Sequence, residues 1–183
     1  MITKQVLPFL ILILMLGCND SNNKVDQNHP GNASVQILDY VYLNSYPHDT
    51  TAFTEGFLIH NGDLYESTGA TSDLPQTRSL FGIVDLQTGK IDTKAELDRV
   101  KYFGEGISIL NGKVFQLTYK TKVGFIYDAT SFKKIGEFTF PSNEGWGLTT
   151  DGINLIMSDG THILTYLDPN TLQVIKTTAV SEK

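Results

Sequence analysis

Phe103-Gly104-Glu105-Gly106-Ile107 is the stretch that decides the fold, because the chain contains two variants of it. Phe53-Thr54-Glu55-Gly56-Phe57 precedes it, and Asn143-Glu144-Gly145-Trp146-Gly147-Leu148 follows it. In each copy an acidic residue and a glycine open a short apolar segment that is typical of a β-strand. The glutamates are separated by 50 residues and then by 39 residues.

Each copy is followed by the same series of predicted elements: a turn, a second strand, a third strand that ends in aspartate, and a fourth strand. The turns contain Asn61-Gly62, Asn111-Gly112 and Asp151-Gly152, and the aspartates are Asp85, Asp128 and Asp168. Self-similarity at roughly 40 to 50 residues with four strands per unit is typical of a β-propeller blade. The sequence therefore predicts an all-β fold, a β-propeller with four-stranded blades. About three blades are present, over Phe53 to about Leu97, Phe103 to about Phe140 and Glu144 to about Val180.

Composition excludes some classes of protein. A chain of 183 residues is long enough for one domain with a substantial core. The net charge of −6 and the lack of any run of Lys and Arg argue against a nucleic-acid partner. With one cysteine, an internal disulfide is impossible.

Residues 1–18 have the features of an export signal with a lipid-attachment site. Lys4 gives a short positive start, and Val6–Leu16 is apolar but shorter than the roughly 20 residues that a membrane-spanning helix needs. The stretch ends in Met15-Leu16-Gly17-Cys18, which resembles the bacterial lipoprotein lipobox. We therefore expect lipidation of Cys18 and an exported protein, anchored to a membrane and facing the periplasm or the cell surface. A plain signal peptide with an incidental cysteine is the alternative.

The rest of the chain divides into a tether and a folded domain. Residues 19–34 are polar and rich in asparagine, which predicts a flexible tether. Residues 35–183 are predicted to be the propeller domain. Its beginning, Val35–Tyr46, is rich in β-branched and aromatic residues and predicts one N-terminal strand, the outer strand of the last blade.

Three blades and one strand cannot close a ring. An open propeller would leave sheet edges exposed to water, which is a liability. We therefore expect the chain to be a C-terminally truncated piece of a longer protein. Roughly two more blades of about 40 residues each would complete a five-bladed ring.

The repeated glutamates form the candidate site. The first strand of each propeller blade lines the central channel, so Glu55, Glu105 and Glu144 are predicted to point toward one small region at its mouth. The glycine after each glutamate lets neighbouring backbones approach closely. Carboxylates crowded in a partly dry site raise one another's pKa, which suits acid–base catalysis. The alternative is that they are structural residues whose carboxylates accept hydrogen bonds from backbone N–H groups.

Aromatic residues accompany these glutamates. Phe53 and Phe103 precede the first two, Trp146 follows the third, and Tyr119 follows a predicted second strand. Aromatic residues in strands mostly belong to the core. Trp146, the single tryptophan, lies between two glycines at the predicted mouth, so we expect it in the site.

Six segments of the chain match one family in order: Tyr46-Pro47-His48-Asp49, Ala52-Phe53-Thr54-Glu55-Gly56, Tyr65-Glu66-Ser67-Thr68-Gly69, Phe103-Gly104-Glu105-Gly106, Gln116-Leu117-Thr118-Tyr119-Lys120 and Glu144-Gly145-Trp146-Gly147-Leu148. From about Val41 to Lys183 the chain resembles the plant and bacterial glutaminyl cyclases, or glutamine cyclotransferases. The resemblance implies a five-bladed propeller that converts the N-terminal glutamine of peptides and proteins into pyroglutamate and releases ammonia, with no metal ion or other cofactor.

The resemblance also implies roles for single residues. Glu105 falls on the family's proposed proton-transfer glutamate, and Trp146 falls on a pocket tryptophan. The family often has glutamine at the position of Glu55 and tryptophan at that of Tyr119. We expect Glu105 to be catalytic. We expect the substrate to be bound by Phe53, Glu55, Phe103, Tyr119, Glu144 and Trp146.

The sequence thus predicts a glutaminyl-peptide cyclotransferase in which Glu105 carries a proton from the substrate's α-amine to the departing ammonia. The alternative is a non-catalytic propeller, a surface lipoprotein that binds peptides or protein partners. A metal site is not expected, because His29, His48, His60 and His162 lack the spacing of ligands. His48 is predicted to be structural, and we expect a monomer.

Overall fold

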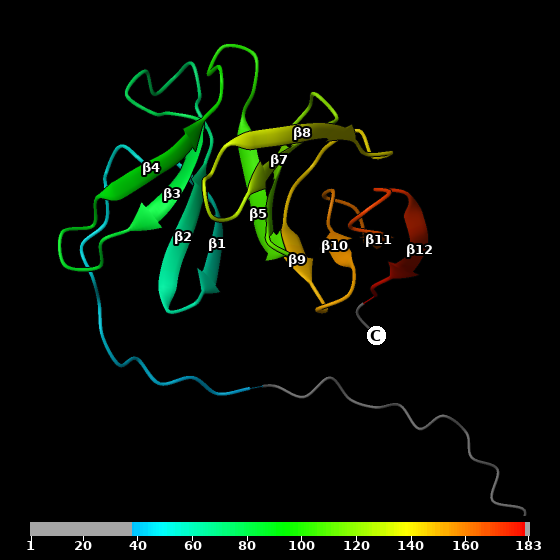
Figure 1. Cartoon of the computed structure of the whole chain (residues 1–183). Helices are drawn as coiled ribbons and strands as arrows, with labels where there is room; N and C mark the ends of the chain where they lie inside the picture. Colours follow the sequence, from blue (N-terminus) through cyan, green and yellow to red (C-terminus); the bar gives the residue numbers. More distant parts are fainter. Residues whose placement is uncertain (1–37, 182–183) are drawn as a thin grey trace, which may run out of the picture. The chain divides into compact units, whose positions relative to one another are not determined.

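The computed structural model describes residues 38–181, and this range folds into three antiparallel sheets of four consecutive strands each (Figure 1). The first sheet consists of β1 (Thr54–His60), β2 (Asp63–Thr68), β3 (Leu80–Val84) and β4 (Ile91–Glu96). The second consists of β5 (Gly104–Leu110), β6 (Lys113–Thr118), β7 (Val123–Asp128) and β8 (Lys134–Thr139). The third consists of β9 (Leu148–Thr150), β10 (Leu155–Met157), β11 (Ile163–Leu167) and β12 (Val174–Ala179).

The three sheets fall within the three predicted repeats, so the predicted all-β fold with four-stranded blades is confirmed. The blades do not close a ring within the described residues (Figure 1). The part of the chain that is described has no helix long and apolar enough to cross a membrane.

Local sequence explains the turn between the first two strands of a blade. Asn61 and Gly62 have φ values of 52° and 90°, and Asn111 and Gly112 have values of 52° and 71°. Two successive positive φ angles are what a tight two-residue hairpin requires, and Asn-Gly adopts them readily. In the third blade the turn is longer, and the Asp151 carboxylate accepts hydrogen bonds from the backbone N–H groups of residues 153 and 154.

The three repeated aspartates end the third strand of each blade in the same way. The carboxylates of Asp85, Asp128 and Asp168 accept a hydrogen bond from the backbone N–H two residues later, at 2.8, 3.1 and 2.8 Å. Backbone hydrogen bonds to the charged form hold the pKa of all three carboxyls below the usual range. The sequence repeat is therefore also a repeat of turn geometry.

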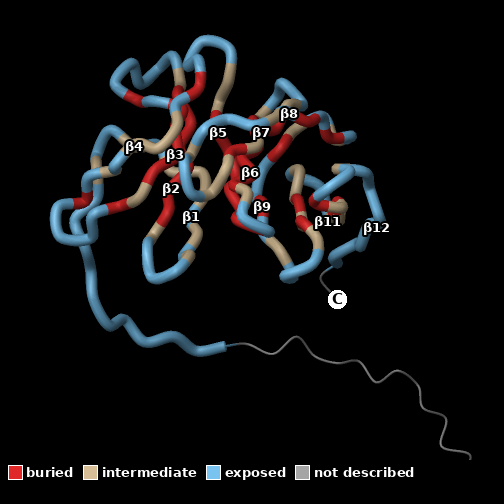
Figure 2. Tube along the Cα trace, viewed as in Figure 1, coloured by how far each residue is buried: buried red, intermediate tan, exposed pale blue. Residues whose placement is uncertain are grey.

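The inner strands β1, β5 and β9 lie next to one another, and the blades fan out from them (Figure 1). The middle blade is covered on both faces, and every residue of β5 is buried (Figure 2). Its strand β6 alternates accordingly. Val114 belongs to the core shared with the first blade, and Phe115 and Leu117 belong to the core shared with the third.

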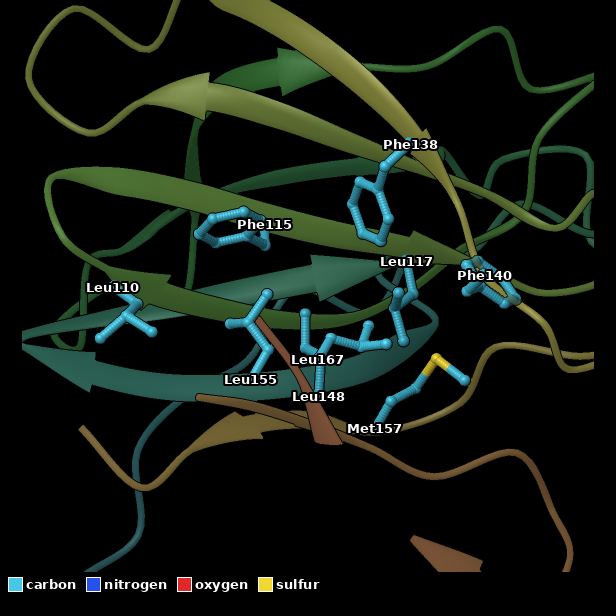
Figure 3. Packing of buried hydrophobic residues seen from close by; sticks show 9 residues of the cluster. All are labelled: Leu110, Phe115, Leu117, Phe138, Phe140, Leu148, Leu155, Met157 and Leu167. Atoms are coloured by element: carbon cyan, nitrogen blue, oxygen red, sulfur yellow. The ribbon is translucent and has the colours of Figure 1, made fainter. Parts of the chain in front are cut away.

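Two hydrophobic cores hold the blades together. The core between the second and third blades consists of Leu110, Phe115, Leu117, Phe138, Phe140, Leu148, Leu155, Met157 and Leu167 (Figure 3). The core between the first and second blades consists of Tyr65, Phe81, Leu97, Ile107, Ile109, Val114, Phe125 and Tyr127. Apolar burial of this kind is the dominant favourable term in folding, so the position of one inner strand against the next depends on these residues.

The prediction of a strand over Val35–Tyr46 is wrong for the residues that are described. Residues 38–46 have no regular secondary structure and are exposed. A strand needs a neighbouring strand for its backbone hydrogen bonds, and none of the twelve strands pairs with this segment. The chain divides into two compact units. Residues 38–42 belong to the first unit, and the second unit, which contains the blades, begins at Leu43. The predicted signal (1–18), the tether (19–34) and residues 35–37 lie outside the described residues.

Candidate functional site

Six of the seven predicted pocket residues line one hollow of about 320 Å³. Phe53 and Phe103 lie directly before β1 and β5, and Glu55 and Glu105 lie within those strands. Tyr119 follows β6, and Trp146 precedes β9. The residues that line the hollow are Phe53, Glu55, Phe103, Glu105, Tyr119 and Trp146. Each blade therefore contributes side chains to the same place, as the repeat predicted, and the volume suits a small ligand.

Both pocket glutamates lie in β-bulges. Along β1 the pairing with β2 shifts between Thr54 and Gly56, so Glu55 has no partner in the register. Along β5 the pairing with β6 shifts between Gly104 and Ile107, which leaves Glu105 and Gly106 in the bulge. A bulge inserts an extra residue and re-aims a side chain, a device that is common beside active sites. The bulges are the local reason why two acidic side chains of inner strands reach the pocket.

The glycines around Glu105 are required by close contacts. A Cβ on Gly104 would lie 2.4 Å from the carbonyl oxygen of Thr68, and one on Gly106 would lie 2.4 Å from the carbonyl oxygen of Trp146. Real Cβ atoms do not approach that closely, so only glycine fits at both positions. The N–H of Gly106 donates to that Trp146 carbonyl at 2.9 Å. The Gly-Glu-Gly sequence thus clamps the Glu105 backbone between the first and third blades.

The two glutamates are close enough to shift each other's pKa. Burial raises the pKa of Glu105 to about 8, and the charges of Glu55 and Glu144 add to this effect. Burial also raises the pKa of Glu55, although the hydrogen bond with Glu105 works in the opposite direction. Glu105 is 7% exposed and keeps its proton at neutral pH. The pocket therefore holds two neighbouring carboxyl groups with raised pKa values, and that of Glu105 is protonated at neutral pH.

Aromatic rings form the walls. The Phe53 and Phe103 rings meet edge to face with centroids 5.9 Å apart, and the Phe103 and Tyr119 centroids are also 5.9 Å apart. The Phe103 ring lies over the backbone of Gly69, where a Cβ would come within 2.2 Å of it. Rings in this arrangement attract one another, and they provide an apolar surface beside the carboxyl pair.

The expectation for Glu144 requires correction. It does not open a strand, because β9 begins four residues later at Leu148, and it does not line the hollow. Its carboxylate instead accepts a hydrogen bond from the Trp146 indole Nε1 at 2.9 Å and lies 3.6 Å from Lys120 Nζ. The reason is that residues 141–147 form the connection between two blades rather than the start of a strand. Glu144 therefore orients the Trp146 ring and acts on Glu105 through its charge.

A buried carboxylate that the sequence analysis gave no role holds the segment before β1. Glu66 is fully buried, and both of its oxygens contact His48 Nε2, at 2.9 and 3.0 Å. The Thr54 hydroxyl donates to the same carboxylate at 2.6 Å. This contact fixes the backbone between Phe53 and Glu55. In the sequence, the signal for this contact is a charged residue, Glu66, within a predicted strand. The prediction that His48 is structural agrees with the contact.

Within residues 38–181, no three His, Cys, Asp or Glu side chains are arranged to hold a metal ion. The chemistry that the described pocket itself offers is proton transfer. The Glu105 carboxyl is buried and keeps its proton at neutral pH, and a second carboxyl and aromatic rings lie beside it. A carboxyl whose pKa is raised toward neutrality can act as both acid and base there.

Replacing Glu105 by glutamine should stabilise the protein at alkaline pH. The carboxyl keeps its proton up to a pKa of about 8 in the folded protein, against the ordinary value of 4.5 in the unfolded chain. As the pH rises from 4.5 to 8, Glu105 ionises in the unfolded chain but not in the folded protein, so the folded state progressively loses stability. We expect Glu105→Gln to raise the free energy of unfolding by about 2 to 5 kcal/mol at high pH, and to change it little at pH 4.

Urea unfolding at pH 4 and pH 8.5 measures this difference. The matched control is Glu137→Gln, the same substitution at an exposed carboxylate of β8. A stabilisation by Glu105→Gln that is the same at both pH values, or no larger than that of the control, would show that the Glu105 carboxyl is not held protonated by its surroundings.

Comparison with known proteins supports one family. The sequence model of a family described as glutamine cyclotransferase matches residues 10–183. A glutaminyl-peptide cyclotransferase from Arabidopsis thaliana is 37% identical over 155 residues, which are 84% of this chain and 45% of that protein. The crystal structure of a Myxococcus xanthus glutaminyl cyclase matches with a TM-score of 0.66 at 25% identity, over 76% of this chain and 56% of that one.

A more distant likeness concerns the fold alone. The WD40 domain of Neurospora crassa Pan2 matches with a TM-score of 0.53 at 10% identity. The chain spans about half the length of the two cyclase relatives. The family match extends over all three blades, including both bulged glutamates and the aromatic walls of the pocket. The chain therefore belongs to the glutamine cyclotransferase family.

Proposed function

We propose that the protein is a glutaminyl-peptide cyclotransferase, which converts the N-terminal glutamine of peptides and proteins into pyroglutamate and releases ammonia. The observation that carries the proposal is the carboxyl pair in the aromatic pocket, with Glu105 protonated up to a pKa of about 8. Membership of the family and the activity of the Arabidopsis relative, a glutaminyl-peptide cyclotransferase, support it.

The reaction needs little more than positioning and proton transfer. The substrate carries its own nucleophile, because the α-amine attacks the γ-carboxamide carbon of the same residue. A C–N bond forms to close the five-membered ring, and the bond to the amide nitrogen breaks to release ammonia. Holding the side chain in the ring-closing conformation is a large part of the catalysis. We assign that role to the rings of Phe53, Phe103, Tyr119 and Trp146.

One proton moves from the attacking nitrogen to the leaving nitrogen. In its ionised form Glu105 takes the proton from the α-amine, and in its protonated form it gives that proton to the departing amide nitrogen. An N-terminal α-amine has a pKa of about 8, close to that of Glu105. Transfer in either direction then has a small free-energy cost, which is the condition under which general acid–base catalysis works best.

Glu105→Gln should lower kcat for Gln-Ala by about 100-fold or more, because the amide can neither take nor give the proton. The release of ammonia from Gln-Ala by the full chain measures this loss of kcat.

The pH dependence of the parent protein gives a second test. The reactive complex shares one proton between the α-amine and Glu105. The parent protein should therefore show a bell-shaped dependence of kcat/KM on pH, with its maximum near pH 8.

Glu137→Gln is again the control, and it should keep the activity of the parent. If Glu105→Gln retains turnover within a few-fold of the parent, Glu105 is not the proton carrier.

Trp146, the single tryptophan, reports on peptide binding independently through its fluorescence. If Gln-Ala changes the fluorescence but the chain releases no ammonia, the alternative of a peptide-binding propeller holds instead.

We also propose that the protein is an exported bacterial lipoprotein, held at a membrane by lipid on Cys18 and acting there as a monomer. The positive start, the short apolar stretch and Gly17-Cys18 support this. Several acyl chains would make the attachment stable. The cyclisation would then take place on exported peptides or proteins with N-terminal glutamine, outside the cytoplasm.

Cys18→Ser should abolish the attachment of lipid. Expression in a bacterial host with radiolabelled palmitate is expected to label the parent chain in the membrane fraction, and the variant should be unlabelled. Labelling of both chains alike, or of neither, would contradict lipidation at Cys18. Cys18 is the single cysteine, so no other thiol can carry the label.

A further inference from the structure

Two fully buried polar side chains lie directly behind Glu105. Ser67 is on β2 in the first blade, Gln116 is on β6 in the second, and both have no exposed surface. Each belongs to a segment that carries the family resemblance, yet neither lines the pocket. Buried polar groups are costly unless they are hydrogen-bonded, so their partners indicate what they do.

Hydrogen-bond chemistry fixes the direction of the contacts. Gln116 Nε2 lies 3.0 Å from Ser67 Oγ and 3.3 Å from the carbonyl oxygen of Leu80. A carbonyl oxygen can only accept, so the amide nitrogen of Gln116 must face it. The second N–H of that nitrogen then donates to Ser67 Oγ. Because Ser67 Oγ accepts from Gln116, its own hydrogen is free for the carbonyl oxygen of Glu105, 2.5 Å away.

The remaining atom of the amide also has a partner. The Tyr127 hydroxyl donates to Gln116 Oε1 at 3.4 Å. The orientation of the Gln116 amide is therefore set at both ends, from β3 of the first blade and from β7 of the second. A network in which every member is satisfied is rigid and fixes one arrangement.

The bulge explains why Glu105 needs this contact. Register is lost between Gly104 and Ile107, so the Glu105 carbonyl has no place in the regular ladder with β6. A buried carbonyl group needs a hydrogen-bond donor, and the Ser67 hydroxyl donates to this one from the neighbouring blade. Gly104 allows the approach, since a Cβ there would lie 3.0 Å from Gln116 Nε2.

We propose that Ser67, oriented by Gln116, is a positioning residue for Glu105, and that it holds the bulged backbone so that the Glu105 carboxyl faces the pocket. The inference rests on the proposed role of Glu105 in catalysis. It assigns a function to Ser67 and Gln116, two residues of the matching segments that do not line the pocket.

A titration tests the positioning without relying on activity. The chain is labelled with ¹³C-glutamate, and the Glu105 carboxyl signal is identified as the one that Glu105→Gln removes. The charged groups that act on Glu105 are Glu55 from β1 and Glu144 from the segment before β9. Ser67→Ala should let the carboxyl leave these surroundings. Because burial and both charges raise its pKa, its titration midpoint should fall by about one unit or more.

The matched control is Thr77→Val. Thr77 lies in the loop before β3, is buried, and donates its hydroxyl to the backbone carbonyl of Leu74 at 2.7 Å. The variant removes the same kind of buried hydrogen bond away from the contacts of Ser67 and Gln116, so the midpoint of Glu105 should stay at that of the parent. If Ser67→Ala does not fold, Gln116→Met leaves the Ser67 hydroxyl without its fixed orientation and is titrated with the same expectation.

A second measurement compares the kinetics of ammonia release from Gln-Ala by the parent and by Ser67→Ala. Ser67→Ala should lower kcat about tenfold or more with KM changed less than about twofold, since it displaces the proton-carrying group rather than the walls of the pocket. Equal midpoint shifts in Ser67→Ala and Thr77→Val, or no shift in either, would overturn the inference. If the parent releases no ammonia, the proposed function fails, and the titration still decides whether Ser67 positions Glu105.

Discussion

One extra residue in each of two neighbouring inner strands determines the pocket. Side chains of a strand alternate strictly between its faces, and a bulge interrupts that alternation. At Glu55 and Glu105 the interruption brings two acidic side chains into one hollow, where the charge of Glu55 adds to the raised pKa of Glu105. The following glycines allow this, because the backbones there approach within van der Waals contact: a Cβ on Gly56 would lie 3.3 Å from Gly106 Cα. The raised pKa of Glu105 and the contact of its backbone with Ser67 are both found at this displacement.

The pocket reduces stability, and the blades offset that cost. A carboxyl group buried beside another carboxyl disfavours the folded state at any pH at which it would otherwise ionise. The middle blade carries Glu105 and is packed on both faces, with β5 entirely buried and Phe115 and Leu117 fully buried in the core on one side (Figure 3). The buried carboxyl group that lowers stability therefore lies on a strand that is itself entirely buried. This pattern is expected where function and stability compete.

The repeat made much of this predictable from the sequence. The Asn-Gly turns, the aspartates at the ends of third strands and the convergence of the Glu55 and Glu105 segments depend on local patterns, and they were predicted. The N-terminal strand was not, because strand propensity at Val41 or Tyr42 creates no hydrogen-bonding partner. Glu144 resembled the other two glutamates in sequence, but the connection to β9 places it beside Trp146 instead of in a bulge. The role of Ser67 depends on contacts 38 residues away, which no local pattern contains.

If Glu105 carries the proton, this bulged glutamate must meet the reacting amine inside the aromatic pocket. A crystal structure of the Glu105→Gln chain with Gln-Ala bound would show where the amine lies. We expect the glutamine side chain to lie among Phe53, Phe103 and Trp146, with its α-amine within about 3 Å of the side chain at position 105. A peptide bound outside this pocket, or one whose α-amine points away from position 105, would contradict the claim.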